Sequence, residues 1–121
     1  MMQHRLDKAA GILVVTPQGP LAASDFEALR TEVDPFIERA GTLRGLLIEV
    51  PVFPGWDGFA GLTAHLRFVR NHHRLIRRVA VVSDNAVLSH LPQLASHFVA
   101  AEVRNFPEAH RAEALDWIQS A

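Results

Sequence analysis

The chain of 121 residues has no cysteine, no tyrosine and a single lysine. Without cysteine it can form no disulfide framework, no thiolate zinc site and no cysteine nucleophile. No apolar run is long enough to cross a membrane, and the N-terminal residues lack the apolar core of a signal peptide. We therefore expect a cytoplasmic protein that folds without metal or disulfide support.

Signatures of common enzymes are also missing. The sequence has no Gly-x-Ser-x-Gly turn and no Gly-Lys-Ser/Thr of a phosphate-binding loop. Ser83-Asp84 and Ser89-His90 are neighbours along the chain, without the arrangement of a catalytic triad. An enzyme is therefore the class that we favour least, and we assign no catalytic residue and no cofactor.

Two pairs of histidines share a spacing of seven residues, His65 with His72 and His90 with His97. On a helix this spacing puts the side chains ~10 Å apart along the axis, too far for one metal ion. We therefore expect partly buried histidines that form hydrogen bonds, and no metal site.

Charge is nearly balanced overall, with 12 basic and 13 acidic residues and a formal net charge of -1. This balance excludes a whole-surface attraction to nucleic acid. The distribution is uneven, because the stretch from Gly58 to Ser83 holds five arginines, three histidines and no acid. That local excess is the strongest charge signal in the sequence.

Apolar runs separated by helical patterns predict an α/β protein. Val79–Val82, closed by Ser83-Asp84, is typical of a strand buried on both faces at the centre of a mostly parallel sheet. A weak N-terminal strand turns through Ala10-Gly11 and pairs antiparallel with the next strand. We expect one domain over residues 1–121 with a mixed sheet of about five strands, at 4–8, 12–16, 46–50, 79–82 and 101–106.

Four helical patterns fill the gaps between these strands. The first helix begins at Ser24, where Ser24 and Glu27 match a capping box. It continues past Pro35 with a kink and ends at Gly41. The last helix begins at Pro107-Glu108.

The second and third helices are predicted from the positions of their apolar side chains. The second runs from about Phe59 to Arg74 and turns one broad face to the sheet, formed by Leu62, His65, Leu66, Val69, His72 and Ile76. The third is capped by Asp84-Asn85, and Pro92 either kinks it or opens a second segment. We expect its inward side chains to be Val87, Leu88, Leu91, Leu94, Ala95 and Phe98.

Several short motifs lie along the chain in a recognisable order. They are Gly55-Trp56, Phe68-x-x-x-His72, the run Arg78–Asp84, the pattern F-x-x-A-E-V-R-x-F from Phe98 to Phe106, and Glu113–Ile118. Together they resemble the SpoIIAA-like family, small bacterial single-domain proteins related to STAS domains. The resemblance spans nearly the whole chain, although each motif is mostly hydrophobic.

The resemblance implies a mixed sheet of about five strands with helices packed against it, as in STAS and CRAL-TRIO domains. It implies no catalytic activity, but carriage or sensing of a small hydrophobic ligand, in some cases with membrane association. It also places a histidine at His72. Two departures matter. The loop Pro51–Gly61 has no Ser or Thr for the phosphoswitch of anti-sigma-factor antagonists, and Val87 lies near where the family commonly has Trp.

The loop Pro51–Gly61 is the main candidate site, because it holds two prolines, three glycines and three aromatics after a parallel strand. Its glycines can present amides to an anion, and loop flexibility explains them equally well. We predict a non-enzymatic domain that holds a small hydrophobic or amphipathic ligand between the sheet's carboxyl end and the second and third helices. Phe53, Trp56 and Phe59 would close the mouth, and the wall would consist of Leu62, Phe68, His72, Leu91 and Leu94. The alternative is a STAS-type interaction module that docks a regulatory protein on the same helical surface.

A basic stripe on the second helix and the strand after it consists of Arg67, Arg70, Arg74 and Arg77. Such stripes are most often solvated helix faces. Their functional interpretation here is attraction to anionic lipid head groups, about 1 kcal/mol per Arg, or to an acidic protein. Peripheral membrane association, a protein partner and a homo-oligomer all stay open.

Overall fold

The computed structural model describes residues 1–121 and contains one five-stranded sheet. The strand order β1-β2-β3-β4-β5 follows the order of the chain. β1 is antiparallel to β2, and the other neighbours are parallel, so the predicted mixed, mostly parallel sheet is confirmed. The strands are Met2–Asp7 (β1), Ile12–Pro17 (β2), Leu43–Glu49 (β3), Ile76–Val82 (β4) and Glu102–Phe106 (β5).

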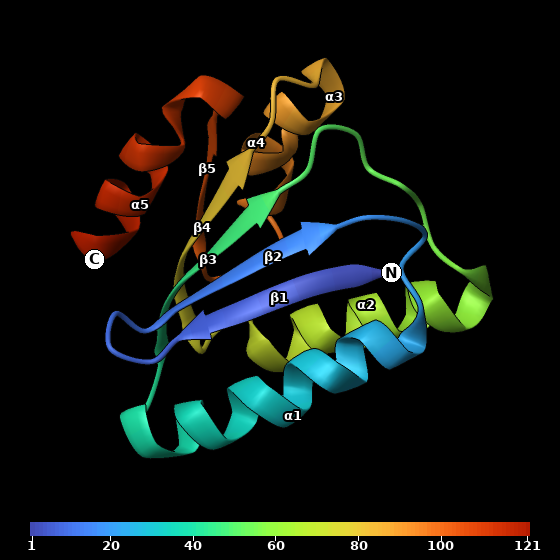
Figure 1. Ribbon diagram of the computed structural model, residues 1–121, viewed down its shortest axis with the longest axis horizontal. Coiled ribbons are helices and arrows are strands. Elements are labelled where there is room, and N and C mark those ends of the chain that lie inside the picture. Colours follow the sequence, from blue (N-terminus) through green and yellow to red (C-terminus); the bar gives the residue numbers. More distant parts are fainter.

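Helices cover both faces of the sheet (Figure 1). Because right-handed connections join parallel strands that follow one another in order, α1, α2, α3 and α4 lie on the same face. The last helix follows β5 and covers the opposite face. The helices are Ala23–Ala40 (α1), Gly58–His72 (α2), Ala86–Ser89 (α3), Leu91–Ala95 (α4) and Arg111–Gln119 (α5), with a 3-10 turn at Glu108–His110.

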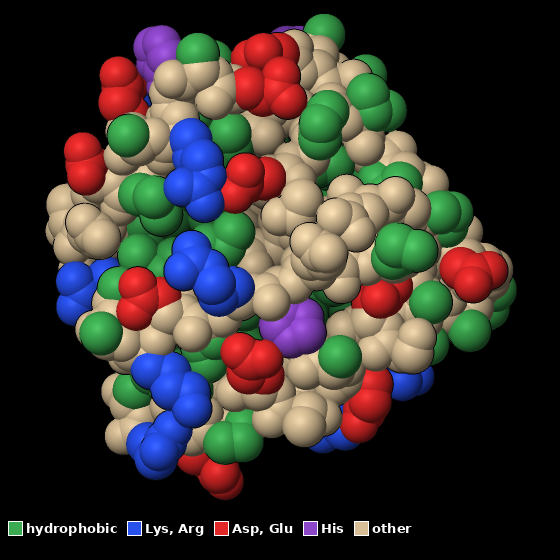
Figure 2. Space-filling model, viewed as in Figure 1, with side chains coloured by type: hydrophobic (Ala, Val, Ile, Leu, Met, Phe, Trp, Pro, Cys, Tyr) green, Lys and Arg blue, Asp and Glu red, His purple; other side chains and the backbone are tan.

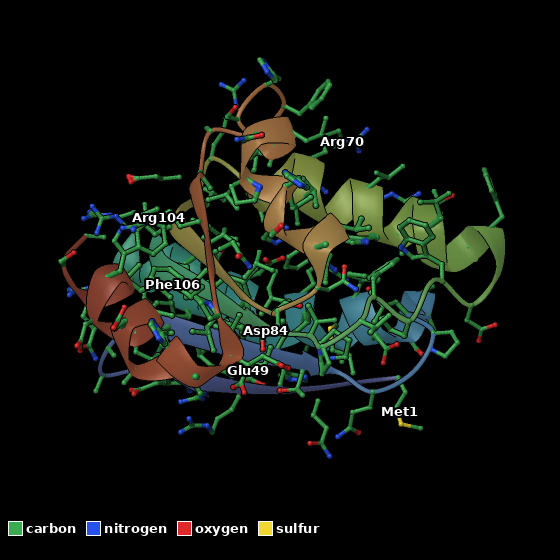
Figure 3. The ribbon with its side chains drawn as sticks, turned by 90° about the horizontal axis from the view of Figure 1, so that it is seen from above. Met1, Glu49, Arg70, Asp84, Arg104 and Phe106 are labelled. Carbon is green, nitrogen blue, oxygen red and sulfur yellow. The ribbon has the colours of Figure 1, made fainter.

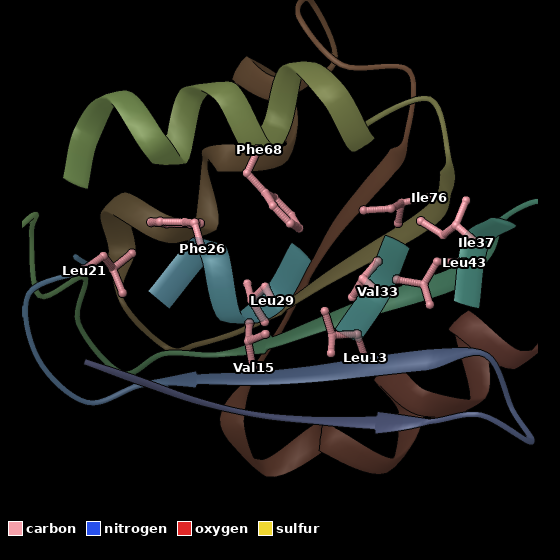
Figure 4. Packing of buried hydrophobic residues seen from close by; sticks show 10 residues of the cluster. All are labelled: Leu13, Val15, Leu21, Phe26, Leu29, Val33, Ile37, Leu43, Phe68 and Ile76. Atoms are coloured by element: carbon pink, nitrogen blue, oxygen red, sulfur yellow. The ribbon is translucent and has the colours of Figure 1, made fainter. Parts of the chain in front are cut away.

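Two separate clusters form the core, one on each face. The larger lies between the sheet and α1 with α2 (Figure 4), and comprises Leu13, Val15, Leu21, Phe26, Leu29, Val33, Ile37, Leu43, Phe68 and Ile76. The smaller lies between the sheet and α5, and comprises Ile12, Val14, Leu47, Ala80, Val82, Phe106, Ala114 and Ile118. Strand side chains alternate between the two clusters, as the period of two requires.

The first helix has the predicted extent but a different cap. Its cap residue is Ala22, whose amide donates to Asp25 Oδ2 at 2.8 Å, whereas Glu27 bonds to Arg30. The predicted Ser24 box is therefore wrong, because the helix begins before Ser24. Partial burial raises the pKa of Asp25, but the Ala22 amide and the N-terminal ammonium group together hold it below its ordinary value.

The other end of α1 is as predicted. The helix continues through Pro35, and Gly41 ends it at a φ of 88°, a conformation that favours glycine. β3 begins at Leu43 rather than at position 46, because the pairing of Leu43 with Ile76 extends the strand.

The predicted third helix is two short helices, which raises the number of helices from four to five. The Asn85 side chain caps α3 as predicted and accepts from the amides of Val87 at 3.0 Å and Leu88 at 3.1 Å. Pro92 opens α4, since proline lacks the amide hydrogen that would continue the preceding helix.

Candidate functional site

The loop between β3 and α2 is hydrogen-bonded through its backbone to Leu21, which precedes the cap residue of α1. The amide of Leu21 donates to Gly55 O at 2.9 Å, and the amide of Asp57 donates to Leu21 O at 2.8 Å. Trp56, between these bonds, therefore bridges to Leu21 like a strand residue. Gly61 in α2 approaches the same carbonyl so closely that a Cβ there would overlap Leu21 O. This contact fixes the rotation of α2 about its axis.

Aromatic side chains connect the loop to the interior. Phe53 meets Trp56 edge-on, with ring centroids 4.9 Å apart. The indole Nε1 of Trp56 donates a hydrogen bond to His65 Nδ1 at 3.0 Å. The His65 ring stacks on Phe26 of α1, with centroids 4.9 Å apart. Trp56 thus contacts Phe53 of its own loop on one side and is held to α2 by the hydrogen bond to His65 on the other.

His65 is neutral in this arrangement. An indole N–H can only donate, so Nδ1 of His65 must carry a lone pair. Burial of the ring lowers the pKa of His65, and no charged group contributes to that shift. Both observations favour the uncharged imidazole, with its proton on Nε2.

His72, two turns further along α2, has the opposite surroundings. Its Nδ1 lies 2.8 Å from Phe68 O, and its Nε2 lies 2.6 Å from Asp34 Oδ1. A carbonyl and a carboxylate can only accept, so the ring is the donor in these contacts, in contrast to Nδ1 of His65. His72 is 4% exposed and stacks on Phe68 with centroids 4.1 Å apart. The expectation of partly buried, hydrogen-bonded histidines is confirmed for this pair.

The face that α2 turns to the interior differs from the predicted one. The buried residues are Gly61, Phe68 and His72, and Leu66 is 62% exposed. The predicted inward position of Leu66 is therefore wrong, that of His72 is confirmed, and Leu62 and Val69 are half-buried, because Gly61 must face Leu21. The Leu66 side chain, which was expected in the core, lies toward solvent.

A shallow hollow of about 250 Å³ marks the outer side of α2. It combines apolar and basic side chains, namely Phe59, Leu62, Thr63, Leu66, Arg67 and Arg70. A larger hollow of about 570 Å³ lies between α1 and α2, with Phe26 and Phe68 among its lining residues. Both are open to solvent, and neither includes Leu91 or Leu94 of the predicted wall.

The basic stripe is exposed and carries no ion pair. Arginine ion pairs are formed elsewhere, by Arg30, Arg78 and Arg111. Arg70 makes only a 3.5 Å contact with its neighbour Asn71, and its side chain extends away from α2 in Figure 3. The stripe therefore presents positive charge that nothing on the protein neutralises.

Among the helices that cover the sheet, α3 and α4 are the least buried. Neither helix buries a residue. The predicted inward positions of Val87, Leu94 and Phe98 are wrong, since these side chains are 79%, 61% and 76% exposed, and Leu91 is partly exposed as well. The segment from Ala86 to Ala100 contains no Asp, Glu, Lys or Arg. Figure 2 shows apolar side chains and no basic ones at the upper right, where α3 and α4 lie in Figure 1.

One flank of α2 faces this segment. Leu62, Val69 and His73 share a flank, because spacings of seven and four residues return to nearly the same direction on a helix. His73 Nδ1 accepts from the amide of Ala100 at 2.9 Å, which directs that flank toward the chain after α4. Exposed apolar side chains of α2 and α4 thus lie on the same side of the molecule. We define the apolar surface as six side chains, of which Leu62 is half-buried and the others are exposed: Phe59, Leu62 and Leu66 of α2, Leu91 and Leu94 of α4, and Phe98 after α4.

The carboxyl ends of β3 and β4, where we predicted the ligand, carry charged side chains (Figure 3). Arg111 Nε donates to Glu49 Oε1 at 2.9 Å. Asp84 Oδ1 accepts from the amide of Glu108 at 2.9 Å, and the Asp84 carboxylate raises the pKa of the Glu108 side chain through a hydrogen bond. No group of three His, Asp or Glu side chains is placed to hold a metal ion.

The predicted site residues thus fall into three groups. Phe53, Trp56, Phe68 and His72 belong to the aromatic packing around α1 and α2. Phe59 and Leu62 lie on the outer side and flank of α2, and Leu91 and Leu94 lie on α4. That they bind a ligand stays a prediction.

Sequence reasoning did not identify the two side-chain hydrogen bonds of this region, from His72 to Asp34 and from Trp56 to His65. Asp34 lies 38 positions from His72, so no local pattern could connect them. Trp56 and His65 are nine residues apart, one in the loop and the other in the helix after it, and this spacing does not predict a contact either.

Comparisons with known proteins agree with this fold. A sequence profile of the family described as SpoIIAA-like matches residues 12–119. A crystal structure of an uncharacterized protein from Shewanella loihica with a SpoIIAA-like fold superposes with a TM-score of 0.77 at 19% identity. The alignment covers 97% of this chain and 93% of that one, and at this identity it shows the fold alone. The search of curated proteins finds no match. No helix has both the length and the apolar character needed to cross a membrane.

Proposed function

Because the chain belongs to the SpoIIAA-like family, we propose that it is a non-enzymatic binding domain for a small amphipathic ligand with an apolar chain and an anionic head. The ligand's apolar part would lie on the apolar surface of α2 and α4. Its head would meet Arg67 or Arg70. No catalytic residue and no cofactor belong to this proposal.

The observation that carries the proposal is the exposure of large apolar side chains on one side of a small protein. Soluble proteins rarely leave contiguous apolar patches to water unless something covers them. Leu66, Leu94 and Phe98 are each more than half exposed. Burying one such side chain against a ligand contributes roughly 1.5–3 kcal/mol, from which the cost of association is subtracted.

The charge around the apolar surface supports an anionic head group. Arg67 and Arg70 line the hollow together with Phe59, Leu62 and Leu66, and no acid occurs between Gly58 and Ser83. An unpaired guanidinium forms strong hydrogen bonds with carboxylate or phosphate oxygens. A ligand that is apolar at one end and anionic at the other complements both features.

Native mass spectrometry and oleate titration test the proposal. Freshly purified protein is expected to carry a co-purifying ligand, and the stripped protein to bind oleate. Leu66→Glu and Leu94→Glu place a charge on the apolar surface and are expected to weaken oleate binding by on the order of tenfold, about 1.4 kcal/mol. Ala112→Glu adds the same charge at an exposed position of α5 and serves as the matched control.

Equal oleate affinity in the parent and both surface variants would contradict the carrier function. The alternative is a STAS-type interaction module, which is favoured by the open, shallow form of the hollow on α2. Such a module would purify without a ligand and would lose a protein partner in the same two variants. The oleate result therefore separates the two functions.

A further inference from the structure

We propose that Trp56 and His65 form a pH-dependent latch, in which protonation of His65 breaks the indole–imidazole hydrogen bond and frees the Trp56 side chain from α2. The latch is a property of the folded chain alone. It does not depend on whether the apolar surface takes up a ligand.

The chemistry of the two rings gives the switch its direction. Trp56 Nε1 and His65 Nδ1 are 3.0 Å apart, and the indole nitrogen can only donate. When His65 gains a proton, both of its ring nitrogens become donors. Two N–H groups then face each other across that distance, so the hydrogen bond is replaced by repulsion.

The surroundings of His65 contain no group that would stabilise the charge. Phe26 of α1 stacks on the ring, and Trp56 of the loop contacts its edge. Charged residues next to these contacts along the chain are Asp25 and Glu27 on α1, Asp57 in the loop, and Arg67 on α2. None of them contributes to the lowered pKa of His65, which is caused by burial. Asp25 and Glu27 have their own partners in the N-terminal amine and Arg30.

The moving part is the side chain, while the loop stays in place. Backbone bonds from Leu21 to Gly55 and from Asp57 to Leu21 hold the chain on both sides of Trp56, and neither involves a titratable group. Trp56 is already 40% exposed, and its remaining ring contact is the edge of Phe53. Acidification therefore releases an indole three residues before Phe59, the first residue of the apolar surface.

Indole N–H signals in NMR spectra test the latch directly. The chain has two tryptophans, and Trp117→Phe assigns the two signals. From pH 8 to pH 5 we expect the Trp56 signal to shift with the same midpoint as the His65 ring protons. That midpoint is expected below 6.5, the ordinary value for histidine. Trp117 should not follow this transition, because its ring lies on the α5 side, beside Phe106.

Substitutions of His65 define the mechanism. His65→Gln keeps an acceptor but cannot be protonated, so the Trp56 signal should no longer titrate. His65→Phe keeps the stack on Phe26 and removes the acceptor, so the signal should resemble a free indole at every pH. His97→Gln changes an exposed histidine after α4 and should leave the titration of Trp56 intact.

Several results would overturn the latch. One is a Trp56 signal that stays constant while His65 titrates. Another is a transition that persists in His65→Gln or that Trp117 shares, since a shared transition reports unfolding. If a His65 variant does not fold, the parent protein decides the question: a Trp56 signal that does not reach the position of a free indole when His65 is protonated contradicts the latch.

Discussion

The two faces of the sheet are covered to different degrees. α5 buries Ala114 and Ile118 completely, and Gly45 on β3 leaves room for Ile118 against the strand. Arg44 and Arg78 donate hydrogen bonds to carbonyls near the end of the same helix. On the other face, α1 and α2 form the larger core cluster, but α3 and α4 bury no residue. One face is closed by packing, and part of the other is left apolar and exposed.

Because the two faces are covered to different degrees, we expect substitutions on them to have different effects, on stability for one face and on binding for the other. Side chains under α5 already have their apolar contacts and can only lose them. Side chains on α4 and on the outer side of α2 still expose apolar area, and burial of such area is favourable by roughly 25 cal/mol per Å². Substitutions on the closed side should therefore change the free energy of unfolding, whereas those on the exposed side should change what the protein binds.

The largest effect is expected in β4, an interior strand of the sheet, although the middle strand is β3 and not, as the sequence predicted, β4. Val81→Asp puts a carboxylate at a position that is 1% exposed, with no basic partner among the core residues. The cost of several kcal/mol for an unpaired buried charge is comparable to the whole stability of a small domain. We expect no cooperative melting transition in circular dichroism. A soluble variant that melts cooperatively would contradict the buried place of β4 between β3 and β5.

A smaller loss is expected on the closed face from Gly45→Ala. The added Cβ would overlap Ile118 Cγ2 and lie 3.1 Å from Ile118 Cβ. Overpacking of this kind costs about 1–3 kcal/mol, measurable by urea unfolding. Ile118→Ala removes Cγ2, the atom that the new Cβ would overlap, and should recover part of the Gly45→Ala loss in a double-mutant cycle. Additive effects of the two substitutions would mean that the contact does not limit the packing of α5.

Acidification should lower the free energy of unfolding by a smaller amount, through the protonation of His65 on α2. Burial lowers the pKa of His65 in the folded state, so below about pH 6.5 the unfolded chain binds more protons than the folded one. The free energy of unfolding should therefore be highest above that pH and fall as the pH decreases toward the folded-state pKa. The Asp25 contribution has the same direction but is lost only at more acidic pH, around and below 3.8.

Urea unfolding at pH 8, 7, 6 and 5 measures the His65 contribution. In His65→Gln the decrease between pH 7 and pH 5 should be reduced, because glutamine does not titrate. Parallel stability curves for the parent and the variant would show that His65 contributes no pH dependence.

The smallest effect on stability is expected from the basic stripe. Changing Arg67, Arg70 and Arg74 together to Gln should leave the free energy of unfolding nearly unchanged, since these arginines form no ion pair. We expect the parent to bind anionic vesicles weakly, with loss of binding as salt shortens screening to ~8 Å. The triple variant should not bind them, and neither protein should bind neutral vesicles strongly. If the parent protein floats equally with anionic and neutral vesicles, the basic stripe is only a solvated surface.

The sheet could be predicted well because its signals are local. The apolar run Val79–Val82, the turn at Ala10-Gly11 and the stop at Gly41 each depend on neighbouring residues. The orientation of α2 could not, because a helical wheel assumes that the most apolar face is buried. That assumption fails where leucines such as Leu66 remain exposed and a glycine, Gly61, makes the closest contact.

The candidate site was only partly predictable for the same reason. Sequence reasoning named Leu62, Leu91 and Leu94, but as the wall of an enclosed pocket between packed helices. In the structure these side chains belong to an open surface, and α4 is too short to pack as a full helix against the sheet. Helix length and the split before Pro92 depend on backbone geometry that apolar spacing does not report.

The strands lie in the sheet in the same order as in the chain, and this order affects how the protein can fold while it is being synthesised. Each new strand pairs with the strand made just before it, so no strand must be inserted between two that are already paired. The sheet can therefore lengthen in one direction as the chain leaves the ribosome, with mostly short-range loops to close at each step. α5 is made last and covers β3 and β4, so the smaller core cluster is completed only when synthesis has nearly ended.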